Sequence, residues 1–414
     1  MLAGAATDIA PRGDSKLLRA FADRRGLIHR YRSWGTSERD LSRPMLWMHA
    51  PSVGEGLQAR PVLQRARAAR PELQLAYTYF SPSAVSFAEK LVVDFKDYLV
   101  LDAPGDTAAA LDALKPTALV FAKLDVWPNL VSAAKTRSVK LGLISATLSP
   151  KSSRQSFIAR SLLGGTYGAL DAVGAIDSAD ADRLIQLGVR QEAIEVTGDT
   201  RYDQVWDRAR SLDRTSVLIA PLISDRPTIV AGSTWPADEA VLLAAIAQIR
   251  RANPELRVIL APHEPTAAHL QPLIDWAKRT GAVAALLGEQ AAAGADVVVV
   301  DRVGVLGDLY GLASIAYVGG GFHSAGLHSV IEPAAFGAPV IFGPLFQMSR
   351  DAELLLQHGG AMSVTDERSM VTTLTRWIRD DRLRREAGHC AQELVRSGLG
   401  AADRAFSLVQ GLLG

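Results

Sequence analysis

A carboxylate stands where an apolar stretch of the chain turns into a helical one. Residues 45–50 read MLWMHA and residues 49–57 read HAPSVGEGL, so a strand-like run leads through Ser52 and Gly54 to Glu55. Apolar side chains at helical spacing follow. A strand that turns through a glycine into a helix usually presents backbone N–H groups to an anion. A glutamate at this turn instead offers a base, the group that takes a proton from a reacting hydroxyl.

A second set of candidate residues lies in the segment YVGGGFHSAGLHSVIEPAAFGAPVIFGP, residues 317–344. A strand ends in glycines, a polar loop follows, and a helix is predicted to begin near Ser329 and to hold Glu332 in its first turns. Glycines let a backbone approach a ligand closely, and a helix N-terminus favours phosphate. Glu332 is suited to accept two hydrogen bonds from a ribose diol. These features favour a nucleotide site, and glycines that merely punctuate the structure are the alternative.

Two further strand ends carry polar residues. The run IVAGSTW (229–235) offers Ser233 and Thr234 as donors to an anion, although an ordinary helix N-cap explains them equally. The run ILAPHEP (259–265) places His263 between two prolines that hold it stiffly. A lone histidine is more often structural than catalytic. The expected position of all three residues is the carboxyl edge of one sheet.

The elements that carry these residues alternate between short apolar runs and helical patterns almost throughout, which indicates parallel sheets with crossover helices. The pattern weakens over 207–227 and then restarts. We therefore expect an α/β protein with two Rossmann-like domains, residues 1–210 and 211–414, facing one another across a cleft at the carboxyl ends of the strands. The last stretch, 365–414, is predicted to be helical, and a return to the first domain is left open.

Composition restricts the class of protein. The 414 residues are 48% hydrophobic and 21% charged with a formal net charge of +1, which argues against a protein that wraps nucleic acid. A single cysteine, Cys390, excludes a disulfide framework. No apolar run approaches the roughly 20 residues that span a bilayer. Residues 16–34 alternate basic with apolar side chains, so a membrane-surface segment and an ordinary amphipathic first helix are both open interpretations.

Several motifs together make the chain similar to a known family. They are HAPSVGEG, WPNL, GDTRYD, GSTW, APHEP, YVGGG, HSVIEPAAFGAPVIFGP and GGA. Their order and spacing over roughly residues 16–400 resemble the 3-deoxy-D-manno-octulosonic acid (Kdo) transferases, GT-B-fold glycosyltransferases of lipopolysaccharide synthesis. The resemblance is specific because the Ser-x-Gly-Glu turn and the His-Ser-x-x-Glu-Pro-Ala segment come from opposite domains.

The resemblance implies a donor, CMP-Kdo, and an acceptor, a lipid A precursor. It also implies inversion at the sugar centre by direct attack, without a cofactor or metal and without a nucleic-acid partner. The expected location is the cytoplasm, peripheral on the inner face of the bacterial inner membrane, with no transmembrane helix. Glu55 matches the catalytic base. The matching donor-binding residues are Ser233, Thr234, Gly320, Gly321, His328, Ser329 and Glu332, and His263 is expected beside them.

The chain departs from the family pattern at several points. Many members read Glu-Thr-Glu before Trp-Pro-Asn, where this chain has Lys123, Leu124 and Asp125. Many read Pro-Arg-His-Pro, where this chain has a histidine and a glutamate between the prolines, and the Gly-Gly-His-Asn loop is longer here. Lys123 is a candidate contact for the sugar carboxylate or an acceptor phosphate, and an ion pair with Asp125 or exposure to solvent is the alternative. The other candidate residues for the acceptor or the sugar carboxylate are Ser52, Gly54, Arg60, Asp125, Lys151 and Arg154.

Other functions remain open on the sequence. One is a different GT-B enzyme that uses another nucleotide sugar, or a sugar-nucleotide 2-epimerase. Another is a non-catalytic protein that keeps the nucleotide pocket. The absence of an arginine at position 263 keeps the first alternative open, and the Ser-x-Gly-Glu turn argues against it. The presence of Glu55 argues against the second, which Lys123 weakly favours.

Overall fold

The computed structural model describes residues 23–324 and 326–414, which divide into two compact units. Unit 1 comprises the chain up to Gln204 together with Gly398–Gly414, and unit 2 comprises Val205–Ser397. The division falls inside helix α10 (Arg201–Arg210) and again just after helix α17 (Asp381–Ser397). Unit 1 is therefore built from two separate stretches of chain, whereas unit 2 is one continuous stretch.

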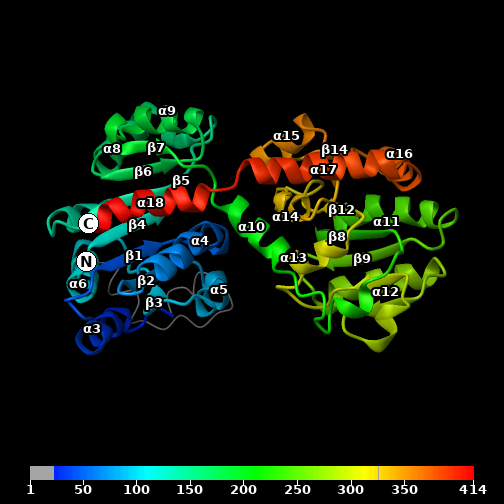
Figure 1. The fold of residues 1–414 in the computed structure, drawn as a ribbon, viewed down its shortest axis with the longest axis horizontal. Coiled ribbons are helices and arrows are strands. Elements are labelled where there is room, and N and C mark those ends of the chain that lie inside the picture. Colours follow the sequence, from blue (N-terminus) through cyan, green and yellow to red (C-terminus); the bar gives the residue numbers. More distant parts are fainter. Residues whose placement is uncertain (1–22, 325) are drawn as a thin grey trace. The chain divides into compact units, whose positions relative to one another are not determined.

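Unit 1 is a seven-stranded parallel sheet in the order β3-β2-β1-β4-β5-β6-β7 with helices packed around it (Figure 1). The strands are β1 (Met45–His49), β2 (Gln74–Tyr79), β3 (Phe95–Tyr98), β4 (Ala118–Ala122), β5 (Lys140–Ala146), β6 (Ala172–Ala175) and β7 (Ile194–Val196). The helices are α3 (Leu27–Ser37), α4 (Val53–Ala69), α5 (Val85–Glu89), α6 (Pro104–Leu114), α7 (Pro128–Lys135), α8 (Phe157–Gly168), α9 (Ser178–Leu187) and α18 (Ala401–Leu413).

Unit 2 repeats this plan, with the parallel order β10-β11-β9-β8-β12-β13-β14. Its strands are β8 (Thr228–Thr234), β9 (Arg257–Pro262), β10 (Ala284–Leu286), β11 (Val297–Val299), β12 (Ile315–Val318), β13 (Val340–Phe342) and β14 (Ala361–Ser363). Its helices are α11 (Pro236–Arg250), α12 (Ala267–Arg279), α13 (Leu306–Leu309), α14 (Ile331–Ala335), α15 (Arg350–Gln357), α16 (Glu367–Arg379) and α17. The prediction of two parallel α/β domains is confirmed.

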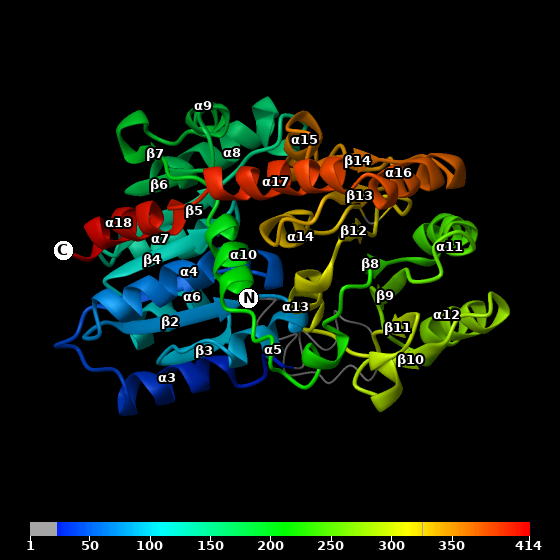
Figure 2. The same ribbon diagram turned by 45° about the vertical axis from the view of Figure 1, so that its right-hand side comes forward.

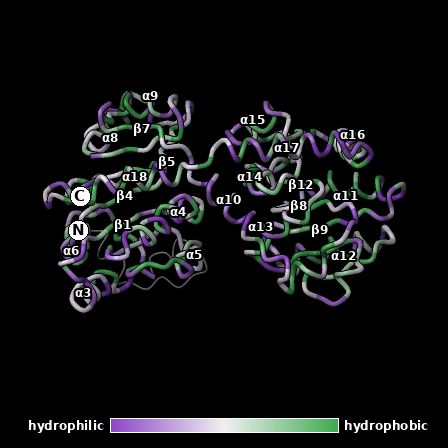
Figure 3. Tube along the Cα trace, in the orientation of Figure 1, coloured by the Kyte–Doolittle hydropathy of each residue, from purple (hydrophilic) through white to green (hydrophobic). Residues whose placement is uncertain are grey.

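The central strands of a parallel sheet are buried because helices cover both of their faces. Every residue of β1, β2 and β4 is buried, whereas the edge strands β3 and β7 have exposed residues. Figure 3 shows hydrophobic stretches in the strands and helices of both units. In each sheet the chain reverses its direction of strand addition once, between β1 and β4 in unit 1 and between β8 and β12 in unit 2. Open α/β sheets bind ligands at the carboxyl ends of the strands that flank such a reversal.

Helix α18 completes unit 1. Figures 1 and 2 both show it beside β5 and α4. Phe406 and Val409 are buried in the same core cluster as the β1 and β4 side chains, and Asp203 accepts hydrogen bonds from the backbone N–H groups of Gly400 and Ala402, each at 2.8 Å. The C-terminal residues are thus part of the first sheet's core.

Helix α3 covers part of the segment 16–34, of which residues 16–22 lie outside the described residues. Leu27 and Tyr31 are buried, and the Tyr31 hydroxyl donates a 2.8 Å hydrogen bond to the carbonyl oxygen of Tyr98. Leu27 and Tyr31 of α3 therefore pack on the unit 1 core, as the apolar side of an ordinary amphipathic helix does. Within residues 23–324 and 326–414, no helix is long and apolar enough to cross a bilayer.

Candidate functional site

Glu55 lies in the first turn of α4, directly after the carboxyl end of β1. Ser52 is the N-cap: its backbone is extended, with φ −136° and ψ 179°, and its Oγ accepts a 3.2 Å hydrogen bond from the N–H of Gly54. The same Ser52 hydroxyl donates to Glu55 Oε2. Serine is preferred at this position because its side chain satisfies an orphan N–H of the first turn. The cap thereby fixes one oxygen of the carboxylate.

The glycine of this turn has a different role from the one expected. Gly54 lies inside α4 without a positive φ, and a Cβ added there would meet nothing closer than Ser52 Oγ at 3.7 Å. The interpretation that Gly54 makes the chain turn sharply is therefore wrong, because the extended backbone of Ser52 makes the turn. Gly56 is the glycine that packing requires, since a Cβ there would lie 2.5 Å from the Phe87 ring and 2.8 Å from the Tyr77 hydroxyl.

Lys123 is the ion-pair partner of Glu55. It follows β4 in a left-handed backbone conformation (φ 66°), and its Nζ donates a 3.1 Å hydrogen bond to Glu55 Oε1. The Glu55 side chain is 16% exposed and that of Lys123 is 49% exposed. The alternative of an ion pair between Lys123 and Asp125 is wrong, because the ammonium group binds the carboxylate across the reversal point instead. A non-glycine residue at positive φ is uncommon and often marks a functional site.

Asp125 belongs to a separate buried network. Its Oδ2 lies 3.3 Å from His49 Nε2 and accepts a 2.9 Å hydrogen bond from the indole N–H of Trp127. His49 is fully buried, and its Nδ1 lies 3.0 Å from the carbonyl oxygen of Thr78. Burial raises the pKa of the Asp125 carboxyl, but the His49 and Trp127 hydrogen bonds and the charge of Arg154 outweigh it and lower the pKa overall. Asp125 is thus an ionised acceptor that orients an imidazole.

Two opposing effects set the ionisation of Glu55. Partial burial raises the pKa of its carboxyl, whereas the Ser52 hydrogen bond and the positive charge of Lys123 lower it, and the net effect is a lowered pKa. Charged donors next to a carboxylate favour its ionised form. Glu55 is therefore a carboxylate at neutral pH, the state that a general base needs.

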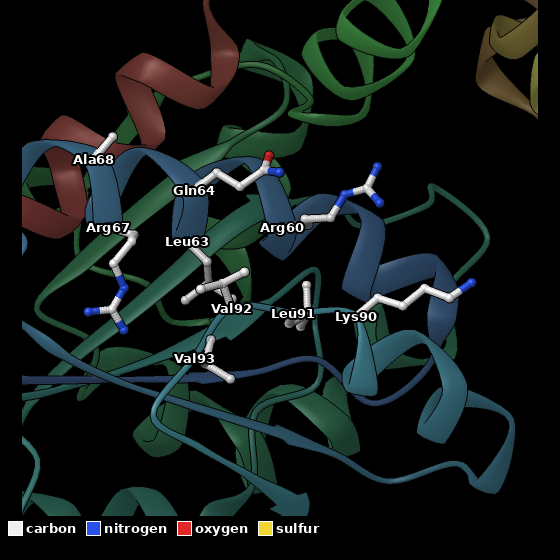
Figure 4. Close-up of a pocket in the computed structure, with 9 residues that line it drawn as sticks. All are labelled: Arg60, Leu63, Gln64, Arg67, Ala68, Lys90, Leu91, Val92 and Val93. Atoms are coloured by element: carbon white, nitrogen blue, oxygen red, sulfur yellow. The ribbon is translucent and has the colours of Figure 1, made fainter. Parts of the chain in front are cut away.

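The remaining expected residues of unit 1 are Arg60, Lys151 and Arg154. Lys151 and Arg154 are exposed in the loop before α8. Arg60 lies one and a half turns after Glu55 on α4, with its guanidinium 5.9 Å from the centre of the Phe87 ring. It lines a pocket of about 280 Å³ between α4 and the segment 90–93 (Figure 4). The walls are Leu63, Ala68, Leu91, Val92 and Val93, and the polar lining residues are Arg60, Gln64, Arg67 and Lys90.

In unit 2, Asp238 organises the glycine-rich loop, and the sequence analysis missed it. This fully buried carboxylate accepts hydrogen bonds from the N–H groups of Trp235 (2.9 Å), Gly320 (2.8 Å) and Phe322 (3.2 Å) and from the Tyr317 hydroxyl (2.8 Å). It joins the turn after β8 to the loop after β12. An Asp three residues after the N-cap of α11 is an ordinary helix-start signal, so only the fold reveals its second set of partners.

The glycines of the loop are needed for backbone contacts. Gly320 has a positive φ of 94°, and a Cβ there would lie 2.1 Å from the carbonyl oxygen of Gly326. A Cβ on Gly321 would lie 2.4 Å from the backbone nitrogen of Gly343. The N–H of Gly320 is already donated to Asp238, so this amide is engaged within the protein and is not an open anion donor, contrary to expectation.

The turn after β8 also differs from both interpretations made of it. Thr234 is buried and its hydroxyl donates a 2.8 Å hydrogen bond to Glu239 Oε1, so it neither caps α11 nor faces an anion. Trp235 is the N-cap residue. Ser233 is only partly buried and has a positive φ of 54° at an irregularity between β8 and β9. Ser233 remains the hydroxyl of this turn that is suited to meet a ligand.

Aromatic rings gather at the ends of β8, β9 and β12. His263 stacks on Trp235 with ring centres 4.5 Å apart, and His323 stacks on it at 4.2 Å with the rings 3° from parallel. The His328 ring is 4.7 Å from that of His263, and His328 Nε2 accepts a 3.3 Å hydrogen bond from the Trp235 indole N–H. Burial and the proximity of His263 lower the pKa of His328. The structure thus brings the two expected histidines together and adds Trp235 and His323.

Glu332 lies on α14, which begins at Ile331, two residues after Ser329. The helix has five residues, so the predicted N-terminal phosphate site has little helix behind it. Burial raises the pKa of the Glu332 carboxyl, the charge of Arg208 lowers it and that of Asp308 raises it, with a raised pKa overall. Ser329 lies in the loop before the helix. Within the described residues, no group of three or more His, Cys, Asp or Glu side chains is placed to hold a metal ion.

Comparison with known proteins identifies similar chains. Residues 19–204 match the family model described as 3-deoxy-D-manno-octulosonic-acid transferase (kdotransferase). A 3-deoxy-D-manno-octulosonic acid transferase of Chlamydophila psittaci is 30% identical over 340 residues, which cover 80% of this chain and 77% of that protein. The enzyme of the same name from Haemophilus influenzae is 24% identical over 374 residues, covering 88% and 86% of the two chains.

Solved structures share the fold at low sequence identity. A UDP-GlcNAc 2-epimerase from Neisseria meningitidis, bound to UDP-GlcNAc, superposes with a TM-score of 0.62 at 12% identity and covers 86% of this chain and 99% of that one. A glycosyltransferase from Rickettsia africae superposes with a TM-score of 0.59 at 10% identity, covering 89% and 98%. The predicted GT-B class is confirmed by these neighbours. By its matches to the family model and to these relatives, the chain belongs to the 3-deoxy-D-manno-octulosonic acid transferase family and is a glycosyltransferase.

Proposed function

We propose that this protein transfers Kdo from CMP-Kdo to a hydroxyl group of a lipid A precursor, with inversion at the sugar centre and with Glu55 as the general base. Family membership supports the transfer of Kdo. The observation that carries the mechanism is the ionised Glu55 carboxylate at the reversal point of the first sheet, held between Ser52 and Lys123. The binding of acceptor by unit 1 and donor by unit 2 follows from this assignment.

The chemistry needs one base and one group of leaving-group contacts. The acceptor oxygen forms a bond to the anomeric carbon while the bond from that carbon to the CMP phosphate breaks, and the hydroxyl proton passes to Glu55. Charge then develops on the departing phosphate, where N–H and hydroxyl donors are needed. We assign Ser233, His263 and His328 to this side, because they gather at the carboxyl ends of β8, β9 and β12.

The nucleoside is assigned to the edge formed by the glycine loop and α14. Gly320 and Gly321 shape that loop through close backbone contacts. Ser329 comes later in the same loop, just before α14. Glu332 is the proposed acceptor of the ribose hydroxyl hydrogen bonds. Its raised pKa fits a site that keeps a carboxylate away from water until hydroxyl donors arrive.

The lipid part of the acceptor is assigned to unit 1. The pocket in Figure 4 has apolar walls and three cationic residues, Arg60, Arg67 and Lys90, which fits an acyl chain with a phosphate beside it. Arg60 and Lys90 are the proposed phosphate contacts because they line this pocket, and Arg67 pairs with Asp94. Lys151 and Arg154 are further candidates for the same role.

Such an acceptor implies work at the inner face of the bacterial inner membrane. Helix α8 supports a peripheral contact because Phe157, Ile158 and Leu162 are each more than 70% exposed beside Lys151 and Arg154. Exposed apolar residues flanked by cations are typical of membrane-surface segments. Flotation on anionic vesicles is expected for the protein and reduced for F157S/L162S. Equal flotation of both would contradict a contact through α8.

The enzymatic experiment uses CMP-Kdo and a purified lipid A precursor. The expected result is release of CMP together with a lipid heavier by one or more Kdo residues. Glu55→Gln keeps the size of the side chain and removes the base, so turnover should fall by a factor of about 100 or more, the range of general-base contributions. Lys140→Gln, a substitution of an exposed lysine on β5, is the control. Full turnover of Glu55→Gln would overturn the assignment of the base.

A further inference from the structure

The two oxygens of the Glu55 carboxylate have different partners. Oε1 accepts from the Lys123 ammonium group at 3.1 Å, and Oε2 accepts from the Ser52 hydroxyl. The two donors come from different places in the fold, one from the end of β4 and one from the cap of α4. We propose that Lys123 is a positioning residue that keeps Oε1 unprotonated throughout the reaction, so that Oε2 takes the proton of the acceptor hydroxyl. This inference rests on the proposed role of Glu55 as the base.

The donor and acceptor capacities of the partners lead to this assignment. An ammonium group has three donors and no acceptor, so a proton on Oε1 would face a group that cannot receive it. A protonated carboxyl has one carbonyl-type oxygen, and Lys123 continues to donate to Oε1 in that role. The Ser52 hydroxyl can rotate, because it has one donor and two acceptor lone pairs, and one of these already serves the N–H of Gly54. Oε2 is therefore the oxygen that can change its protonation state.

The position of Lys123 is set by the backbone. Its φ of 66° is unusual for a side-chain-bearing residue, and its N–H donates a 2.9 Å hydrogen bond to the carbonyl oxygen of Ile144 in β5. The strand register therefore holds the lysine in an uncommon conformation that directs its side chain to α4. Backbone conformations of this kind persist only where the surrounding structure over-determines them.

The side chains that lower the pKa of Glu55 are those of Ser52 and Lys123. The charge of Glu55 also acts on Tyr77 of β2, whose hydroxyl is buried with no hydrogen-bond partner among the described residues. Burial and the Glu55 charge both raise the pKa of Tyr77, so it stays neutral and does not titrate with the base. Lys123 is consequently the cation whose removal should change the ionisation of Glu55.

The experiment compares Lys123→Met with Lys140→Met, a substitution of an exposed lysine on β5. The carbon-13 shift of the Glu55 carboxyl, assigned by its loss in Glu55→Gln, is followed through a pH titration of each protein. The midpoint is expected to rise by about half a pH unit or more in Lys123→Met, because an opposite charge within hydrogen-bond distance favours the charged form. The midpoint in Lys140→Met and in Lys123→Arg should match that of the unaltered protein. An unchanged midpoint in Lys123→Met would overturn the inference.

The pH dependence of kcat/KM gives the second test. The acidic limb of Lys123→Met should move to higher pH by the same amount, and kcat on the plateau should fall, because the carboxylate loses one of the two donors that position it. If Oε1 were the oxygen that takes the proton, the lysine would have to leave it first, and the plateau kcat of Lys123→Met would rise. Such a rise contradicts the proposal. The carboxyl titration does not depend on turnover, so it separates a failure of this inference from a failure of the proposed reaction.

Discussion

At the scale of single residues, the two candidate glutamates are in opposite electrostatic situations. Ser52 and Lys123 lower the pKa of Glu55, whereas burial raises the pKa of Glu332. A general base must be ionised before the reaction, so a lowered pKa suits Glu55. A carboxylate that is to accept hydrogen bonds from a bound ribose can be buried beforehand, so a raised pKa is compatible with the role of Glu332. The environments thus assign the two carboxylates to different tasks, even though each follows a strand in a similar α/β unit.

The raised pKa of Glu332 predicts a conflict between stability and binding. Folding favours the neutral form of the Glu332 carboxyl. The destabilisation caused by its buried charge is therefore absent below the unfolded-state pKa. It grows as the pH rises towards the folded-state pKa and is complete above it. Glu332→Gln should therefore stabilise the protein at pH 7.5, because the amide removes the cost of burying a charged carboxylate. The gain should vanish near pH 4.

Thermal unfolding at several pH values measures this stability, and calorimetric titration with CMP measures the effect on binding. CMP should bind Glu332→Gln at least tenfold more weakly, because an amide accepts the ribose hydrogen bonds less strongly than a carboxylate. A variant that is less stable at pH 7.5 and binds CMP as before would contradict both the burial argument and the ribose assignment.

At the scale of elements, the sequence predicted the strands, the turns and the residues after them, but not the partners of those residues. Ser52 and Glu55 could be placed at a strand-to-helix turn because capping and apolar periodicity are local signals. The Lys123–Glu55 pair could not be predicted, since it depends on β1 and β4 being neighbours across the reversal point. Asp238 was missed for the same reason: its partners on β12 and the following loop are about 80 residues away.

Asp238 makes the glycine loop and the start of α11 one structural element. Asp238→Asn keeps the shape but turns one acceptor oxygen into a donor, which leaves at least one of the four hydrogen bonds unmade. An unsatisfied buried group costs about 1–3 kcal/mol, so the expected loss of stability is of that order. The loop should also lose its fixed position, and KM for CMP-Kdo should rise more than kcat falls.

Asp366→Asn, which alters the exposed cap of α16 in the same unit, is the matched control. It should lower stability slightly and leave the KM for CMP-Kdo unchanged, because its partners lie within one helix turn. An Asp238→Asn enzyme with the KM of the unaltered protein would mean that the loop keeps its shape without this carboxylate.

At the scale of the whole molecule, the two units differ in how far each depends on a distant part of the chain to complete its core. Unit 2 is continuous from Val205 to Ser397 and has its own buried core. Unit 1 depends on α18, which supplies core side chains and whose start is held by Asp203. Its Leu412 packs so closely on β5 that a Cβ on Gly142 would lie 2.7 Å from it. The core of unit 1 is therefore incomplete without α18, the last helix of the chain.

This topology predicts different behaviour for two fragments. Residues 205–397 should fold alone, with cooperative thermal unfolding, and should bind CMP. Residues 1–204 should not, because loss of α18 removes several buried apolar side chains worth about 1.5–3 kcal/mol each, a large share of the roughly 5–15 kcal/mol that stabilises a domain. Joining residues 398–414 to residue 204 through a short flexible linker should restore cooperative unfolding. The same fusion with Phe406→Ser and Val409→Ser should not, and a fragment 1–204 that unfolds cooperatively without α18 would show that the first sheet is complete before the chain ends.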